Sequence, residues 1–132
     1  MEIEMLTPVN PPEAKWPGLS QGMLIKGSGF FVSGGHVGTD VEGNPVTSSM
    51  EDQIVAMFES LGRTLKAAGL SFADIARATC YVREFSPELL ATIKEVRKRY
   101  YDQACPPASV MVQAGLYDPA FHAEIEVIAV VR

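Results

Sequence analysis

The segment from Ser48 to Gly69 carries the pattern that most restricts how this chain can fold. Ser48 and Glu51 have the spacing of a capping box, in which each side chain satisfies a backbone N–H group of a helix's first turn. Gly69 provides a C-terminal stop. An amphipathic helix with so long an apolar face needs a partner layer, most simply a β-sheet. The residues that form this face are Met50, Ile54, Met57, Phe58, Leu61, Leu65 and Ala68.

Short β-prone segments lie on both sides of this helix. They occupy residues 3–6, 23–25, 30–32, 78–82, 109–112 and 123–131. Residues 26–29, with two glycines, predict a hairpin turn between the second and third of these segments. A second helix is expected to begin at Ser86, with Pro87 at its first position. Its predicted buried face consists of Leu89, Ile93, Val96 and Tyr100. This order predicts an α+β fold in which two helices cover one face of a mixed β-sheet.

Polar side chains alternate with apolar ones at the start of the last predicted strand. Glu124 and Glu126 share one face of that strand, while Ala123, Ile125 and Val127 share the other. After Val127 both faces are apolar. The two carboxylates are therefore expected on the same side of the sheet.

Length and charge restrict the class of protein. The chain has 132 residues, which predicts a single domain over residues 1–132. Its formal net charge of −5 weakens any nucleic-acid function, because phosphate binding depends on clustered Lys and Arg. No apolar run approaches the ~20 residues of a spanning helix, and the acidic N-terminus is unlike a secretory signal. Cys80 and Cys105 are expected to be free thiols, and the chain is expected to be cytoplasmic.

Common cofactor and metal motifs do not fit this sequence. The glycines at positions 27 and 29 lack the third glycine and the helix of a dinucleotide-binding loop. His122 and Glu124 match the first part of a zinc deaminase motif, but the P-C-x-x-C part that completes that metal site is missing. His36 and His122, with Asp40 or Glu124, are too few to predict a metal cluster. Neither a metal nor a cofactor is expected.

Several segments in a fixed order resemble one family. They are Gly18-Leu19-Ser20-Gln21-Gly22, Phe31-Val32-Ser33-Gly34-Gly35, Leu65-Lys66-Ala67-Ala68-Gly69-Leu70, Pro107-Ala108-Ser109-Val110 and Glu124-Ile125-Glu126-Val127-Ile128-Ala129. Over residues 16–132 the chain resembles the RidA/YjgF family, also called L-PSP endoribonuclease-like. The resemblance implies a chorismate-mutase-like fold and a homotrimer with ligand clefts between subunits. It also implies hydrolysis of reactive enamines and imines to a keto acid and ammonia.

The resemblance assigns site residues to only part of the family's pattern. Glu124 matches the acid that handles the water, and Ser33 and Gly34 match residues that line the cleft. Ala108 stands where the family has an arginine that grips the substrate carboxylate through two hydrogen bonds. Losing that contact should cost about 2–5 kcal/mol, so standard 2-aminoacrylate deaminase activity is not expected.

Three more positions depart from the family. Leu19 replaces a cleft tyrosine, Lys94 replaces an asparagine on the second helix, and Val110 replaces a thiol. One hypothesis keeps an enzyme site in which Glu124 positions water and Lys94 supplies a displaced positive charge. The alternative is a non-catalytic trimeric module that binds a small, more apolar ligand. An endoribonuclease is disfavoured by the acidic net charge.

Overall fold

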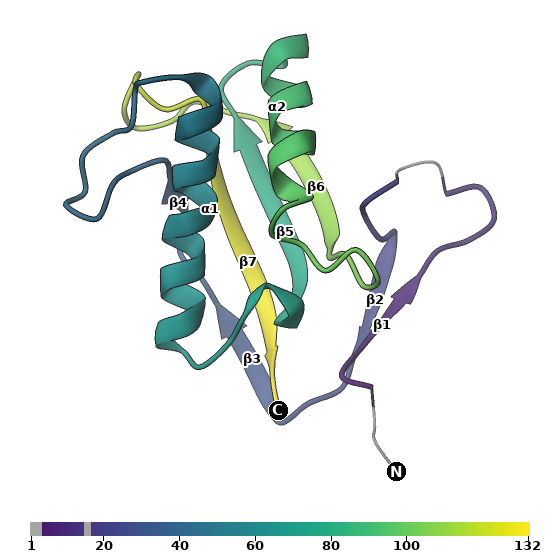
Figure 1. Cartoon of the computed structure of the whole chain (residues 1–132). Helices are drawn as coiled ribbons and strands as arrows, with labels where there is room; N and C mark the ends of the chain where they lie inside the picture. The colour runs from purple at the N-terminus through teal and green to yellow at the C-terminus, as the bar shows by residue number, and fades with distance from the viewer. Residues whose placement is uncertain (1–3, 15–16) are drawn as a thin grey trace.

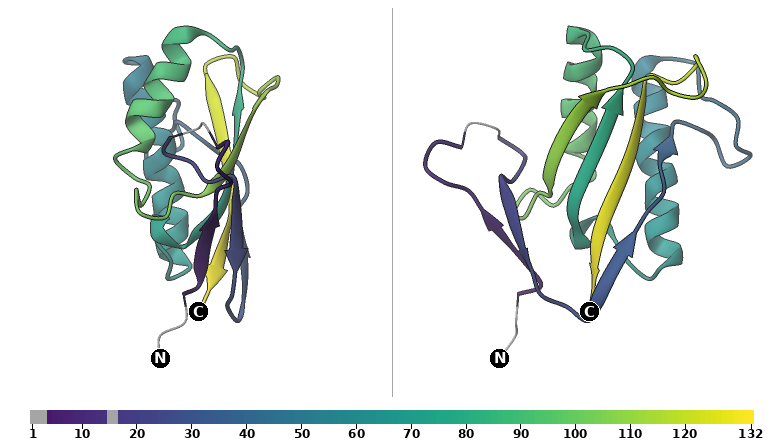
Figure 2. Two further views of the ribbon diagram at one scale, coloured as in Figure 1. Left: turned by 90° about the vertical axis from the view of Figure 1, so that its right-hand side faces the viewer. Right: turned by 180° about the vertical axis from the view of Figure 1, so that it is seen from behind.

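The computed structural model describes residues 4–14 and 17–132. Its centre is a five-stranded mixed sheet in the order β3-β7-β5-β6, with β4 also paired to β7. The strands are β3 (Gly29–Val32), β4 (His36–Val37), β5 (Ile75–Val82), β6 (Ala108–Gln113) and β7 (Ala123–Val131). Helices α1 (Met50–Ala67) and α2 (Pro87–Arg97) lie side by side on one face of this sheet (Figure 1). The predicted α+β fold is confirmed, and Figure 2 shows that the described residues leave the opposite face without a helix. None of the described helices is both long and apolar enough to cross a membrane.

Helix α1 begins one residue later than the sequence pattern predicts. Its N-cap is Ser49, whose hydroxyl accepts a hydrogen bond from the Asp52 backbone N–H, while the Ser48 hydroxyl donates to the Asp52 carboxylate. The predicted capping box of Ser48 and Glu51 is therefore wrong, because Asp52 rather than Glu51 contacts the cap. The predicted apolar stripe is buried against the sheet through Ile54, Met57, Phe58, Leu61 and Leu65. Gly69 follows the helix with a φ of 75°, a conformation that favours glycine.

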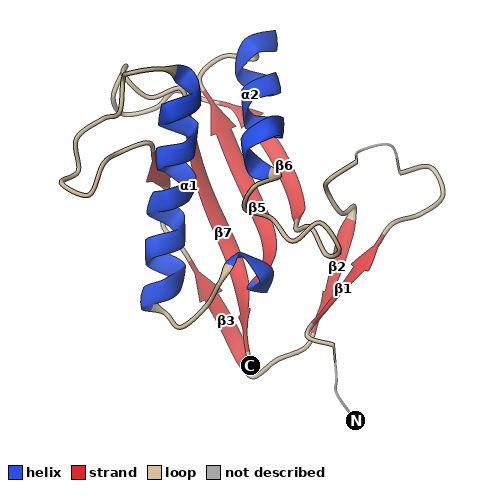
Figure 3. Ribbon diagram, in the orientation of Figure 1, coloured by secondary structure: helices blue, strands red, loops and turns tan. Residues whose placement is uncertain are grey.

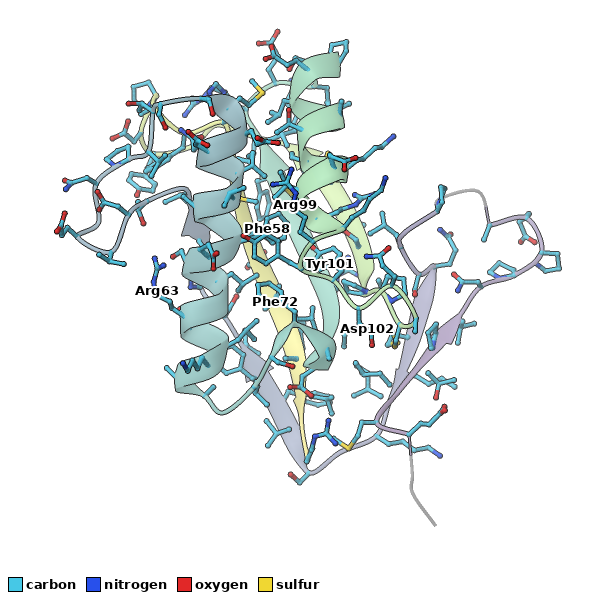
Figure 4. All side chains as sticks on the ribbon, in the orientation of Figure 1. Phe58, Arg63, Phe72, Arg99, Tyr101 and Asp102 are labelled. Carbon is cyan, nitrogen blue, oxygen red and sulfur yellow. The ribbon has the colours of Figure 1, made fainter. Side chains whose placement is uncertain are left out.

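An aromatic cluster joins α1 to the segment that follows α2. Helix α2 begins at the predicted Ser86 cap, with Leu89, Ile93 and Val96 buried. Beyond its end, the Tyr100 ring stacks on Phe58 with a centroid separation of 5.0 Å. Phe72, in the short helix η1 (Phe72–Asp74), and Tyr101 pack on the same Phe58 ring, as Figure 4 shows. These contacts fix α2 beside α1, on the β5–β6 side of the sheet (Figure 1).

The N-terminal strands differ from the prediction in two ways. Strands β1 (Leu6–Val9) and β2 (Gly22–Ile25) form a separate two-stranded sheet, which stands apart from the main sheet in Figure 3. The strand predicted at residues 3–6 thus begins at Leu6, and residue 3 lies outside the described ranges. Pro8 is tolerated in β1 because that strand has only β2 as a neighbour.

The hairpin predicted between β2 and β3 is also wrong. Strand β2 pairs with β1, and β3 pairs with the end of β7. Ser28 is the physical reason. Its backbone N–H donates to the Val131 carbonyl, and its hydroxyl donates to the backbone carbonyl of Arg132. The glycine-containing turn is therefore bound to the chain's last strand rather than closed on itself.

Gly38 should tolerate no side chain, since it lies directly against α1. A Cβ atom at this position would overlap the carbonyl oxygen and Cγ of Gln53. The carbonyl belongs to the helix backbone, and the side chain is held by hydrogen bonds to the Val46 and Ala120 carbonyls. We expect Gly38→Ala to lower the free energy of unfolding by about 1–3 kcal/mol through overpacking. Chemical denaturation measures this effect, with Gly115→Ala as the control because a Cβ there meets nothing within 4 Å. Equal stabilities of the two variants would contradict this packing.

Candidate functional site

The two glutamates of β7 lie on the helix-free face of the sheet, with different surroundings. Glu124 lies opposite Tyr81 of β5, and Glu126 lies opposite Thr79. The Tyr81 hydroxyl donates a hydrogen bond to the Glu126 carboxylate. This bond, together with burial and the charges of both glutamates, raises the pKa of Tyr81. The Glu124 carboxylate accepts no hydrogen bond and forms no ion pair with the residues that the structure describes, which leaves both of its oxygens available.

The Glu124 carboxylate rests on Gly35. A Cβ atom at Gly35 would overlap Oε2 of Glu124 and lie 2.8 Å from its Cδ. The backbone pairing of Val37 with Glu124 brings the two segments together. The turn that contains Ser33 and Gly34, the cleft residues predicted from the sequence, is thus adjacent to the predicted acid.

The Ser33 hydroxyl holds this turn against β7 through two hydrogen bonds. Its hydroxyl accepts a 2.8 Å bond from the Val127 N–H and donates a 2.8 Å bond to the Gly34 carbonyl. His36 ties the same turn to α1, because its ring nitrogens lie 3.0 Å from the Gly34 carbonyl oxygen and 2.7 Å from Oγ1 of Thr64. Ser33 and His36 are therefore positioning residues for the segment beneath Glu124.

Gln53 and Arg83 fix the loop that leads into Glu124. The Gln53 amide donates to the Ala120 carbonyl and accepts from the His122 N–H, both at 2.8 Å. Arg83 donates to the Phe121 carbonyl from the end of β5. Sequence reasoning assigned neither residue this role. A signal was available for Gln53, since a polar side chain beside the apolar stripe of a helix must find a hydrogen-bond partner when it is buried.

A cavity of about 680 Å³ lies at the outer edge of β6, beneath the side of α2 and beside residues 17–19. Leu19, Lys94 and Val110, three of the predicted ligand-binding residues, line it. Ala108, the position of the family's arginine, is not part of its wall. Ala108 instead pairs with Arg77 of β5. We call this space the α2 cavity.

The α2 cavity and Glu124 lie apart on a single chain. Strand β5 stands between β7 and β6, and Val110 is two residues along the strands from the level of Glu124. With strands about 4.8 Å apart and about 3.3 Å per residue, the Cα atoms of Glu124 and Val110 are separated by about 12 Å. Within one chain Glu124 is therefore not part of the wall of the α2 cavity.

The two thiols are poor candidates for nucleophiles. Cys80 and Cys105 are free, as predicted. Burial raises the pKa of the Cys80 thiol to about 12 and also raises the pKa of Cys105. Both thiols are therefore protonated at neutral pH, and the reactive form of a cysteine is the thiolate. Within the described ranges no three His, Cys, Asp or Glu side chains gather as metal ligands would.

Comparisons with known proteins agree on one family. The family model described as Endoribonuclease L-PSP matches residues 13–131. The chain is 27% identical to the 2-iminobutanoate/2-iminopropanoate deaminase of Bos taurus over 128 residues, which cover 96% of this chain and 89% of that protein. It is 24% identical to a RutC family protein of Aquifex aeolicus over 120 residues, 90% of this chain and 93% of that one. The crystal structure of the Rid family protein YyfB from Yersinia pestis, a protein of unknown function, matches with a TM-score of 0.86 and 25% identity, covering 97% of this chain and 100% of that one.

Proposed function

The chain belongs to the RidA/YjgF family, whose model is described as Endoribonuclease L-PSP, and on that premise we propose that it hydrolyses an enamine or imine in a cleft between two copies. The observation that carries this proposal is the Glu124 carboxylate, which rests on Gly35 and is bonded to no described residue, while Glu126 is occupied by Tyr81. Similarity to an iminobutanoate/iminopropanoate deaminase supports the class of reaction.

In the proposed reaction, Glu124 acts on water. The carboxylate accepts a proton as the water oxygen bonds to the imine carbon, and the C=N π electrons move to nitrogen, which takes up a proton. The proton taken by Glu124 passes to this nitrogen, which restores the carboxylate. As the C–N bond breaks, the hydroxyl proton also moves to nitrogen, ammonia leaves and a C=O bond forms, so that imine and water become a keto compound and ammonia. An enamine enters the same sequence after tautomerising to the imine. The exposed turn at Gly34 borders the place where this water would sit.

The helix-free face of the sheet supports an assembly of several copies. Phe30 and Val32 of β3 are 66% and 70% exposed. They share this face with Val110, Val112 and Ile128, which are also exposed. An apolar sheet face of this kind requires cover, and a symmetric homo-oligomer provides it. In such an assembly, Glu124 of one copy would lie beside the α2 cavity of its neighbour.

We expect the chain to form a homotrimer in solution. Three copies of the 14.3 kDa chain give a mass of about 43 kDa. Light scattering coupled to size-exclusion chromatography measures this mass directly. Replacing Val32 with Lys should weaken the assembly, because it places a charge on the apolar face. A 14.3 kDa particle for the unmodified chain would remove the cleft between copies and with it the proposed site.

A screen of imines tests the reaction itself. Imino acids made in place by an amino-acid oxidase, with catalase to remove peroxide, are followed through the release of keto acid. We expect acceleration over spontaneous hydrolysis, with small three-carbon imines poorly used because the family's arginine is absent at Ala108 and a small imine leaves the apolar wall of the α2 cavity unfilled. Binding of keto acids without acceleration of any imine would instead favour the non-catalytic module, which the apolar residues Leu19 and Val110 in the cavity wall support.

A further inference from the structure

Helix α2 presents two neighbouring stripes of side chains. Leu89, Ile93 and Val96 point into the core. The adjacent stripe, Leu90, Lys94, Arg97 and Lys98, lines the α2 cavity. Residues spaced by three, four and seven positions share one side of a helix, so the cavity receives three cations from the last two turns of α2. In a chain with a net charge of −5, this is a local concentration of positive charge.

Arg97 lacks a counter-charge within the described ranges. Lys98 is 3.6 Å from Glu95 in an exposed pair, whereas Arg97 forms no ion pair there. The titratable side chains that interact with Arg97 are Tyr101 and Cys80. Burial raises the pKa of both groups, so both are uncharged at neutral pH. Burial also lowers the pKa of the Arg97 guanidinium itself. A half-buried cation without a carboxylate is unfavourable unless an anion joins it.

The rest of the cavity wall is apolar. Leu19, Phe85, Leu90 and Met111 surround the space beside the cations. Its volume of about 680 Å³ greatly exceeds that of a three- or four-carbon acid. The combination of one cationic side and one apolar side matches a molecule with a charged end and a bulky apolar body.

We propose that the α2 cavity binds an organic carboxylate with a bulky apolar body, its carboxylate held by Arg97 and Lys94 and its body packed against Leu19, Phe85 and Met111. This rests on the proposed function and names its substrate class, the imine of a large apolar amino acid. In the family an arginine at the position of Ala108, on β6, holds the substrate carboxylate. Here Arg97 and Lys94 of α2 would take over that role. Arg77 is the rival cation, since it pairs with Ala108 across β5 and β6.

Binding of stable probes tests this proposal without catalysis. Isothermal titration with phenylpyruvate, pyruvate and uncharged phenylacetone separates the two ends of the ligand. We expect phenylpyruvate to bind at least roughly tenfold more tightly than either of the others, because only it uses both the cations and the apolar wall. Equal affinities for pyruvate and phenylpyruvate would overturn the proposal.

Three charge-neutralising variants locate the cation. Arg97→Gln should weaken phenylpyruvate binding by roughly tenfold or more, while Arg77→Gln and Arg63→Gln should leave it unchanged. Arg63 is the matched control, on the side of α1 away from α2 in Figure 4. Loss of binding in Arg77→Gln, with Arg97→Gln unaffected, would overturn the assignment. Because Lys94 is exposed, Lys94→Gln provides a second variant of low folding risk, and its weaker binding is expected as well.

The outcome is independent of the proposed reaction. Phenylpyruvate binding and imine hydrolysis are measured separately, so a failure of one is distinguishable from a failure of the other. Phenylpyruvate binding without turnover would contradict the reaction and leave the ligand class in place. Turnover of small imines without a preference for bulky ones would contradict the ligand class and leave the proposed reaction in place.

Discussion

Replacing Glu124 with glutamine should lower turnover of an imine by roughly 10²–10⁴-fold, the usual contribution of a general acid–base group. The amide keeps the shape of the carboxylate over Gly35 but cannot accept the proton of the attacking water. Glu124→Gln should still bind phenylpyruvate, because the cations and the apolar wall that hold this ligand come from the α2 cavity and are unchanged. Steady-state rates with an oxidase-generated imine, together with titration of phenylpyruvate, measure both quantities.

Glu126→Gln is the matched control for this variant. It makes the same change two residues away, on the same face of β7, where Tyr81 can still donate to the amide oxygen. We expect turnover to stay within about threefold of the unmodified chain, since Glu126 is already engaged. If the two variants lost activity equally, the distinction between an occupied and an available carboxylate would be wrong.

Gly35→Ala should abolish most of the activity while the fold remains intact. The added Cβ would overlap the carboxylate end of Glu124, which is the far end of a flexible side chain and swings aside at little cost. A displacement of about 1 Å at a catalytic group is enough to lower the rate by roughly 10²-fold. The midpoint of thermal unfolding should shift by only about 2 °C, as expected for a change of well under 1 kcal/mol.

Gly34→Ala provides the comparison, one residue earlier in the same turn. A Cβ there meets nothing within 4 Å, and neither glycine has a positive φ, so alanine adopts both backbone conformations. We expect this variant to lose less activity than Gly35→Ala, because its Cβ borders the proposed cleft but leaves the Glu124 carboxylate in place. Activity lost equally in both variants would mean that the turn itself, rather than the position of Glu124, is what the alanines disturb.

The sequence predicted the elements of this fold well where a periodic pattern reported on burial. The stripe from Ile54 to Leu65 and the alternation around Ile125 each had one interpretation, because a residue on the core side must be apolar. Pairing partners were harder to predict. The turn at residues 26–29 has the composition of a hairpin, but Ser28 bonds to the end of β7, more than 100 positions away. Local sequence carries no record of that contact.

In the site, too, the sequence predicted the residue types but not their contacts with distant parts of the chain. Glu124 and Glu126 look equivalent in sequence, and the choice of Glu124 came from family resemblance alone. The structure adds the physical difference, which is the Tyr81 hydroxyl on the neighbouring strand. Nothing in the sequence singles out Arg97, which is one of three successive cations near the end of the second predicted helix. Its place in a cavity wall depends on how α2 lies over β6, which no periodicity predicts.

The central claim is that the acid of one copy serves the α2 cavity of another. Glu124→Gln and Arg97→Gln chains, each expected to lose roughly tenfold or more of its rate at low substrate concentration, are co-expressed with different affinity tags. Assemblies that carry both tags are then purified. If the site is shared between copies, a neighbour's Glu124 completes a cavity with an intact Arg97. Each trimer that contains both kinds of chain then has one such restored site among its three, so about one third of the sites regain both groups. We predict recovery of about that fraction of the unmodified rate. Mixed assemblies as inactive as their two parents would contradict the claim, because they would show that both groups must come from the same chain.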